Sequence, residues 1–439
     1  MAVASKQNPT RSERLTGMTP LAVAAGLRHL PGMVFFDTAG NLPASAKCPV
    51  SVIAARPTRI LRGSIHAAAD QQVLREVLAA GAGTDAVATV TRAATVPVWP
   101  LGGLCGWVDY EGDFVFGEFP EMLVFSHADQ TWWETGWLSA ELRPAVVDSV
   151  AIGPFSAMIS RDQFLGGVAR IKDWIAAGDI YQVNLSQAFV AEVIGASLFG
   201  LYEALRAASP APMAAWLALD GKEVLSSSPE SFLTIYGRTI ETRPIKGTRP
   251  RCVTPSADLR SAYDLQTSAK EIAELVMITD LLRNDLGQVC EFGSVQVAAM
   301  LQLESLAQVH HLVSTVTGTL RPDTDAIAAL AACFPGGSIT GAPKKRAMEI
   351  IRELENAPRG IYCGALGWFG YNGTSSFNIA IRTLVRNGSR LVYQVGAGIV
   401  ADSDPAQEYA ETLHKAAGIR LAVASQACQQ ASPVSGGRH

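Results

Sequence analysis

The chain has 439 residues, of which 48% are hydrophobic and only 17% are charged, so it can bury a large core and is neither a disordered protein nor a mini-domain. The formal net charge of -4 gives no overall attraction to nucleic acid or to an anionic membrane, and the sequence predicts neither as a partner. Seven cysteines without a CxxC pair argue against a disulfide framework or a structural zinc site, and we expect reduced thiols in a cytoplasmic protein.

Both ends of the chain are polar and are predicted to be disordered tails, residues 1–15 and 425–439. The first tail lacks the hydrophobic run of a signal peptide, and no apolar run elsewhere is long enough to span a bilayer. Residues 16–150 form an N-terminal part in which we find no catalytic cluster. Its predicted elements are four strands and one helix: Val34–Asp37, Ile60–Gly63, Leu104–Val108, Met122–Phe125 and Ala68–Ala80.

The second part, residues 151–424, opens with a predicted helix over 162–177, which Ser160 can cap and Gly178 can end. Strands follow, and Pro229 breaks one of them and leaves Glu230 at the bend among small and apolar neighbours. Such surroundings raise the pKa of a carboxyl group towards values that suit a general acid. The alternative is a glutamate that faces solvent.

The segment Arg243–Arg251 places one lysine, Lys246, between two prolines. Pro244 and Pro250 remove backbone donors, so we predict a loop, neither helix nor central strand, that presents the lysine. Gly247 lets the backbone approach a ligand where a Cβ would collide. The alternative is a solvated basic turn.

One long helix is predicted over 256–283 and another near the C-terminal end of the chain. Each carries two glutamates three residues apart, Glu271 with Glu274 and Glu408 with Glu411, so the carboxylates of a pair share one helix face. Two such helices facing each other would offer carboxylate oxygens to a hard divalent cation, for which Mg2+ is the best candidate. Either pair by itself can also be a solvated helix face.

Between these helices the sequence predicts a strand with paired histidines at 309–314 and a glycine-rich turn entering a helix at 334–344. Such a turn can collect an anion on its backbone N–H groups, but it lacks the ending of a nucleotide-binding P-loop. Arg382 is predicted in an apolar strand, where it must find an acid or a bound carboxylate, because an unpaired buried charge is too costly. Gly396 and Gly398 offer another place where backbone can touch a ligand.

The chain contains, in this order, Ser228-Pro229-Glu230, Pro244–Thr248, Ala273-Glu274, Asp280–Asp285, His311–Ser314, Phe334–Lys344, Ile381–Thr383 and Gly396–Lys415. These motifs resemble those of the chorismate-utilising enzymes, and the resemblance covers residues 162–421. It implies an α+β fold of two large antiparallel sheets packed on each other with helices outside, in α/β/β/α layers. It also implies that the N- and C-terminal parts interleave.

Two positions distinguish branches of this family. Anthranilate synthases carry alanine where this chain has Lys246, and isochorismate and salicylate synthases carry a water-activating lysine where it has Gln182. The chain therefore resembles the aminodeoxychorismate synthase branch, which converts chorismate and ammonia to 4-amino-4-deoxychorismate in 4-aminobenzoate and folate biosynthesis. An anthranilate synthase component and a non-catalytic ligand-binding relative are the alternatives.

The resemblance also implies roles for individual residues. Lys246 is the nucleophile that forms a covalent adduct, and Glu230 protonates the departing hydroxyl. Glu274 and Glu411 hold Mg2+, with Glu271 and Glu408 acting through water. A separate glutamine amidotransferase subunit supplies ammonia, because the synthase fold uses up the length of the chain. The implied substrate-binding residues are Gly247, Thr248, His311, Thr340, Trp368, Arg382, Gly396, Gly398 and Lys415; Trp368 and Ser376 replace the tyrosine and aspartate usual in the family.

Overall fold

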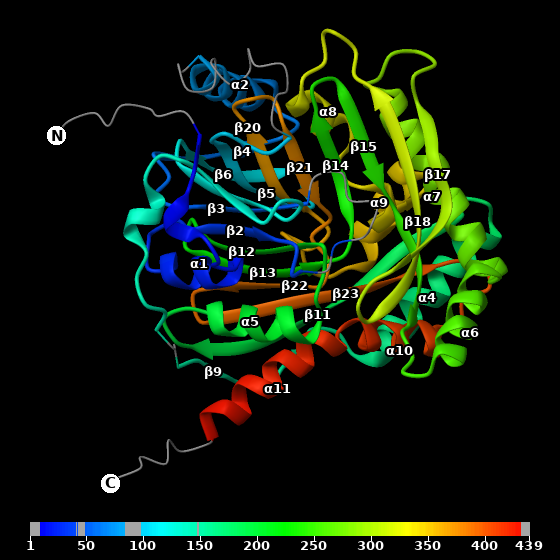
Figure 1. Cartoon of the computed structure of the whole chain (residues 1–439). Coiled ribbons are helices and arrows are strands. Elements are labelled where there is room, and N and C mark those ends of the chain that lie inside the picture. The colour runs from blue at the N-terminus through cyan, green and yellow to red at the C-terminus, as the bar shows by residue number, and fades with distance from the viewer. Residues whose placement is uncertain (1–8, 41, 43–48, 84–97, 147–148, 432–439) are drawn as a thin grey trace.

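The computed structural model describes residues 9–40, 42, 49–83, 98–146 and 149–431. Two antiparallel sheets pack against each other, and helices lie outside them (Figure 1). The expected α+β fold with two large packed sheets is confirmed. In Figure 1 the strands of the larger sheet run across the view and those of the smaller sheet run up it, so the two sheets cross. None of the described helices is long and apolar enough to cross a membrane.

Among the described residues, the larger sheet has 13 strands, and β11 and β23 form its longest pairing. Its main order is β1-β8-β7-β3-β2-β12-β13-β22-β23-β11-β10, with β9 and β19 also pairing with β11. The pairing of β2 with β12 joins the N-terminal part of the chain to the C-terminal part. The strands are β1 Thr10–Arg11, β2 Val34–Asp37, β3 Val50–Ala54, β7 Met122–Ser126, β8 Thr131–Thr135, β9 Ala151–Ile152, β10 Ser156–Ala157, β11 Gln182–Ile194, β12 Met213–Leu219, β13 Lys222–Ser228, β19 Gly341–Ala342, β22 Thr383–Asn387 and β23 Arg390–Ile399.

The smaller sheet, in the part of the chain that the structure describes, has 10 strands in the order β16-β18-β15-β14-β21-β20-β5-β6-β4, with β17 also pairing with β18. Here β5, from the N-terminal part, pairs with β20, so both sheets are built from both parts of the chain. The strands are β4 Arg59–Ser64, β5 Gly103–Val108, β6 Asp113–Phe119, β14 Ser231–Tyr236, β15 Thr239–Arg243, β16 Ile245–Pro250, β17 Gln296–Ser305, β18 Val309–Thr319, β20 Ala365–Gly370 and β21 Ser375–Asn378.

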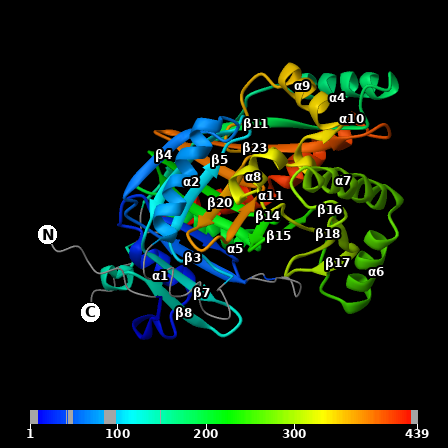
Figure 2. The same cartoon turned by 90° about the horizontal axis from the view of Figure 1, so that it is seen from above.

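The helices cover the sheets in groups. On the larger sheet, α4, α9 and α10 pack against β11 and β23, while α5 and α11 pack together further along. On the smaller sheet, α6 and α7 lie beside β16 and β18, and α2 covers β4 and β5 (Figure 2). The helices are α1 Pro20–Leu27, α2 Ala68–Ala82, α4 Arg161–Ala176, α5 Phe199–Ala208, α6 Pro255–Gln266, α7 Ala269–Gly287, α8 Ala326–Cys333, α9 Lys344–Leu354, α10 Pro405–Lys415 and α11 Ala417–Ala431; short 3-10 turns occur at Glu13–Leu15, Leu138–Glu141 and Gly337–Ile339.

Strand β2 shows how the core is divided. Val34 and Phe36 belong to the apolar cluster between the two sheets, whereas Phe35 belongs to the cluster under the outer helices. Side chains of a strand alternate between its faces, so a strand covered on both sides reads as an unbroken apolar run. This is why the run Val34-Phe35-Phe36 predicted a strand without showing hydrophobic alternation.

Helix α4, Arg161–Ala176, begins and ends within one residue of the predicted bounds. The Ser160 hydroxyl accepts a hydrogen bond from the Gln163 N–H, the Gln163 side chain accepts one from the Ser160 N–H, and Gly178 has a φ of +83°. The single helix predicted over 256–283 is wrong, because the chain forms α6 and α7 with a break between them. Ser268 caps α7 by accepting a hydrogen bond from the Glu271 N–H, so a new helix begins there.

Both predicted tails are too long. Thr10–Arg11 pairs with β8, and the Leu15 side chain is completely buried, because an apolar residue so close to an edge strand can join the core. At the other end α11 continues to Ala431. Residues 1–8 and 432–439 lie outside the described part of the chain.

Candidate active site

Lys246 lies in an edge strand and not in the loop that its prolines predicted. Pro244 separates β15 from β16, and both strands pair with β18. Lys246 stands opposite Leu312, and the register shifts at Gly247, which has a φ of +71°. An edge strand needs only half of its backbone donors for pairing, which is how it accommodates proline. The expectation that the segment is not a central strand holds.

Gly247 brings β16 close to α6, which carries Leu265, and to α7, which carries Glu271. A Cβ on Gly247 would lie 2.6 Å from a methyl group of Leu265 and 3.1 Å from the Glu271 carboxylate. The strand can therefore approach the acidic helix face only where no side chain intervenes. The Lys246 ammonium lies 3.9 Å from a Glu274 carboxylate oxygen, and its side chain is 16% exposed. The chain thus directs the lysine to the glutamates and away from bulk solvent.

The two glutamate pairs face each other across a lysine. Glu274 comes from α7 and Glu408 from α10, and the Lys270 Nζ lies 4.0 Å from the first and 3.8 Å from the second. Glu411 forms a 2.8 Å ion pair with Lys415. The structure therefore brings Glu274 and Glu408 from the two helices to one lysine ammonium, whereas Glu271 pairs with Arg249 at 3.4 Å.

No group of three or more His, Cys, Asp or Glu side chains in the described part of the chain is close enough to hold a metal ion. Burial raises the pKa of Glu274, although the charges of Lys246 and Lys270 oppose this. Burial also acts to raise the pKa of Glu411, but the ammonium groups around it, Lys415 first, bring the pKa below its ordinary value. The carboxylates of α7 and α10 thus favour a positive charge between the two helices. A magnesium ion at this place stays a prediction.

Glu230 occupies the bend between β13 and β14. Its backbone is held by hydrogen bonds with the Ser228 hydroxyl and with the Ile379 N–H, and its side chain is buried. Burial raises the pKa of Glu230 to about 7, and the Ser338 side chain and the charge of Lys246 limit this rise. A carboxyl group that is half protonated near neutral pH is suited to give up a proton in a reaction.

His311 lies opposite Thr248 in the sheet, and its Nδ1 is 3.0 Å from the Thr248 hydroxyl. Its Nε2 is buried and has no hydrogen-bond partner among the described residues. Burial lowers the pKa of His311 to about 4, and the charge of Arg382 adds to this effect. The imidazole is therefore neutral near pH 7, with one nitrogen left for a ligand.

Arg382 does not lie in a strand, as the sequence predicted, but at the joint between β21 and β22, where its φ is +51°. Within the described part of the chain, its guanidinium forms neither a hydrogen bond nor an ion pair. Burial lowers the pKa of Arg382. A largely desolvated guanidinium without an acid is costly, so the site calls for an anionic ligand.

Gln182 and Lys246 meet beside Gly398. A Cβ on Gly398 would lie 2.5 Å from the Gln182 side-chain nitrogen and 3.7 Å from the Lys246 ammonium. Both polar atoms of the Gln182 side chain are buried without a partner among the described residues. Nearby, Lys415 donates a 3.0 Å hydrogen bond to the Gly396 carbonyl. This small space collects unpaired hydrogen-bonding groups beside the lysine.

The comparison with known proteins identifies the family of the chain. A family model described as chorismate binding enzyme matches residues 124–420. The chain belongs to this chorismate binding enzyme family.

Relatives within the family include two kinds of synthase. The anthranilate synthase component 1 of Methanothermobacter thermautotrophicus is 40% identical over 341 residues, covering 72% of this chain and 73% of that protein. The aminodeoxychorismate synthase component 1 of Bacillus subtilis is 39% identical over 338 residues, covering 71% of each. The crystal structure of anthranilate synthase component I from Streptococcus pneumoniae has a TM-score of 0.73 at 29% identity, covering 86% of this chain and 94% of that one.

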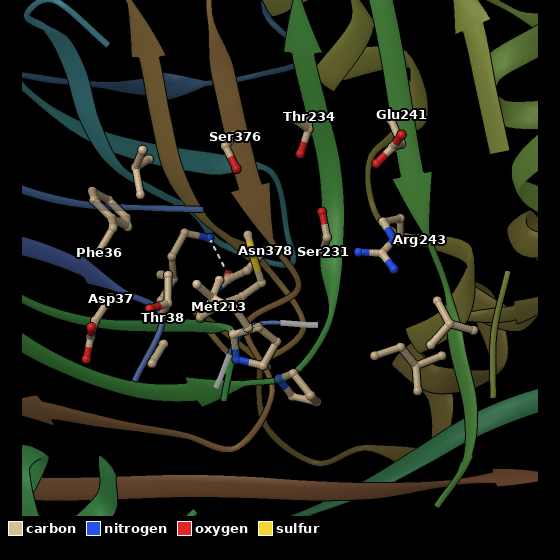
Figure 3. Close-up of a pocket in the computed structure, with 18 of the residues that line it drawn as sticks. Phe36, Asp37, Thr38, Met213, Ser231, Thr234, Glu241, Arg243, Ser376 and Asn378 are labelled. Carbon is tan, nitrogen blue, oxygen red and sulfur yellow. Dashed lines mark hydrogen bonds between the residues drawn. The ribbon is translucent and has the colours of Figure 1, made fainter. Parts of the chain in front are cut away.

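A cavity of about 360 Å³ lies between the two sheets of this chorismate binding family member. Figure 3 shows polar side chains around it, among them Thr234, Glu241 and Arg243. Two predicted substrate-binding residues line it, His311 and Trp368. The Trp368 ring packs edge-on against Phe36, with ring centroids 5.2 Å apart, so its contact with substrate stays a prediction.

Thr340 is completely buried, and its hydroxyl donates within its own turn, to the carbonyls of Gly336 and Gly337. The predicted contact of this hydroxyl with substrate is not tested by its placement.

The sequence did not single out Lys270 or Ser338. The available signals were weak, because Lys270 merely precedes Glu271 and Ser338 is a small polar residue inside a glycine-rich turn.

Proposed function

We propose that this chain is component I of an aminodeoxychorismate synthase, which converts chorismate and ammonia to 4-amino-4-deoxychorismate and water. The observation that supports it most is the position of Lys246. Its amine lies 3.9 Å from Glu274, beside the unpaired Gln182 amide and in the electrostatic reach of Glu230. A nucleophilic lysine is the feature expected of this branch and not of anthranilate synthases.

The dianionic substrate is bound mainly by groups that lack protein partners among the described residues, Arg382 and the His311 Nε2, and Lys415 adds a second positive charge. The Arg382 guanidinium pairs with one carboxylate of chorismate, and Lys415 lies close enough to Gly396 to assist. His311 donates or accepts a hydrogen bond through its unpaired Nε2. Gly398 allows the ring to approach the backbone, because a side chain there would occupy the space in front of Lys246.

In the first step the uncharged amine of Lys246 adds to C2 of chorismate. The ring double bonds shift, and the C4 hydroxyl leaves as water after taking a proton from Glu230. In the second step ammonia adds at C4, and the bond between C2 and the lysine nitrogen breaks with return of its electron pair to the nitrogen. The proton released by the added ammonia returns to Glu230, which restores the starting state.

Mg2+ is the proposed cofactor, held by Glu274 and Glu411, with Glu271 and Glu408 acting through water. The donors are hard carboxylate oxygens, as this ion prefers, and two of them, from Glu274 and Glu408, already lie within 4.0 Å of the Lys270 ammonium, so the space suits a cation. When bound, the ion would supply Lewis-acid binding of the ring carboxylate. The ammonia is proposed to come from a glutamine amidotransferase subunit.

The test is incubation with chorismate, Mg2+ and an ammonium salt, with and without an added aminodeoxychorismate lyase. We expect a product that yields 4-aminobenzoate only when the lyase is present. Lys246→Ala should abolish or sharply reduce this product, whereas Lys345→Ala, which changes an exposed lysine on α9, should not. Full activity of Lys246→Ala would remove the covalent role of this lysine.

Anthranilate synthase is the second candidate, because a relative of that name is as similar as the aminodeoxychorismate synthase. It would form fluorescent anthranilate in the same incubation without any lyase. Appearance of that product would overturn the proposed branch and leave the family assignment intact.

A further inference from the structure

Glu408 is the most deeply buried of the four glutamates on α7 and α10. Its side chain is 4% exposed, against 13% for Glu274, 19% for Glu271 and 46% for Glu411. A carboxylate that has lost its hydration needs a hydrogen-bond donor from the protein. The residue that supplies this donor has no role in the function proposed above.

The donor is the hydroxyl of Ser403, which lies in the turn between β23 and α10. Ser403 is buried, and its hydroxyl donates a 2.6 Å hydrogen bond to Oε1 of Glu408. The same oxygen lies 3.8 Å from the Lys270 ammonium of α7. Ser403 therefore holds the carboxylate oxygen that lies next to a cation from the facing acidic helix.

Ser403 is itself fixed by its surroundings. Its hydroxyl oxygen accepts a 3.1 Å hydrogen bond from the Val400 N–H, and its own N–H donates to the Val400 carbonyl at 3.0 Å. The Lys172 ammonium of α4 donates to the Ser403 carbonyl at 2.7 Å. A hydroxyl has a single proton to donate, so these contacts leave that proton for Glu408.

The hydroxyl of Ser403 is not needed to begin or to hold helix α10. Asp404 caps this helix, because its side chain accepts a 2.9 Å hydrogen bond from the Gln407 N–H. Further along, the Gln187 side chain of β11 donates a 2.7 Å hydrogen bond to the Thr412 hydroxyl and ties the helix to the larger sheet. The contact of the Ser403 hydroxyl with the carboxylate therefore calls for another explanation.

We propose that Ser403 is a positioning residue for the cation site: its hydroxyl holds the Glu408 carboxylate so that a water molecule on the magnesium ion meets an oxygen already in place. The inference rests on the proposed function, because it requires the magnesium site. A glutamate side chain has several rotatable bonds, and a fixed donor restricts them before the ion binds. Without the hydroxyl, the carboxylate can move towards the Lys270 ammonium, which competes with the ion.

The test is calorimetry of Mg2+ titrated into the full chain in the absence of chorismate. Ser403→Ala should bind Mg2+ about 10- to 100-fold more weakly than wild type. In the Glu408→Gln background the same serine substitution should cause no further loss, because the hydroxyl acts through that carboxylate. In the ammonia-dependent assay, excess Mg2+ should restore most of the rate of Ser403→Ala, whereas a purely structural defect would lower the rate at every concentration of the ion.

The matched control is Ser139→Ala, which removes the same kind of contact far from the acidic helices. The Ser139 hydroxyl donates a 2.7 Å hydrogen bond to the buried carboxylate of Glu134 on β8. Its loss should leave the affinity for Mg2+ unchanged.

Unchanged or tighter Mg2+ binding by folded Ser403→Ala would overturn the proposal, as would a further loss in the double variant. If the serine variant does not fold, Lys172→Met, which frees the turn from α4, takes its place: it should weaken Mg2+ binding, and an unchanged affinity would overturn the proposal equally. If the wild-type chain bound no Mg2+, the magnesium site of the proposed function would fail, and this inference with it.

Discussion

Glu230→Gln should make the protein more stable and less active. The carboxyl group is buried and its pKa is about 7 in the folded chain against an ordinary value of 4.5, so the folded state resists its ionisation. The difference corresponds to about 3 kcal/mol, as an upper figure, between the two protonation states. Because the pKa is raised on folding, the wild-type protein loses this stability as the pH rises from about 4.5 through 7.

The neutral amide avoids this loss. Relative to wild type, Glu230→Gln should therefore gain up to about 3 kcal/mol of unfolding free energy between pH 5 and pH 8, while the rate falls by about 100-fold or more for lack of the acid. Urea unfolding of both proteins at the two pH values measures the first effect, and the ammonia-dependent assay measures the second. Glu353→Gln, at a half-exposed surface position, is the control and should show no such pH-dependent gain.

The reasoning would be refuted if the stability of Glu230→Gln relative to wild type were the same at pH 8 as at pH 5. That result would mean that the carboxylate is well solvated, and that its burial does not tune it as an acid.

Three further substitutions test the site. Arg382→Gln should raise the KM for chorismate about 10- to 100-fold, because it removes a charged hydrogen bond to the substrate. It should not lower the stability in urea, because the lost charge is desolvated and lacks a partner in the described structure. A destabilised variant with an unchanged KM would contradict this. Lys270→Met should bind Mg2+ about 10-fold more tightly in calorimetry, because the substitution removes the ammonium group that competes with the ion for Glu274 and Glu408. Unchanged or weaker binding would contradict the magnesium site. Gly247→Ala should lower the unfolding free energy by about 1 to 3 kcal/mol and impair turnover. The φ of residue 247 is +71°, and the new methyl group would collide with Leu265. Wild-type stability in urea would instead show that β16 can shift.

The resemblance names residues that lie far apart in the sequence and close together in the structure. Glu230, Lys246 and Glu274 were named from motifs, and the structure brings them together although 44 residues separate the first from the last in the sequence numbering. Lys270 was not named, because nothing in a local pattern indicates that one lysine will reach both acidic helices.

The sequence by itself determined the local elements. Helix α4 follows from apolar spacing, the Ser160 cap and Gly178, and the shared face of Glu271 and Glu274 follows from their separation of three residues, since each of these signals lies within a few residues of its effect.

Tertiary structure decided the environment of the site. It placed Lys246 in an edge strand against β18, gave Arg382 a positive φ, and buried the Glu230 side chain. The pairing of Lys246 with Leu312, for example, joins residues 66 positions apart in the chain. Such pairings are fixed only when the sheets close and exclude water, which no local preference of the backbone can specify.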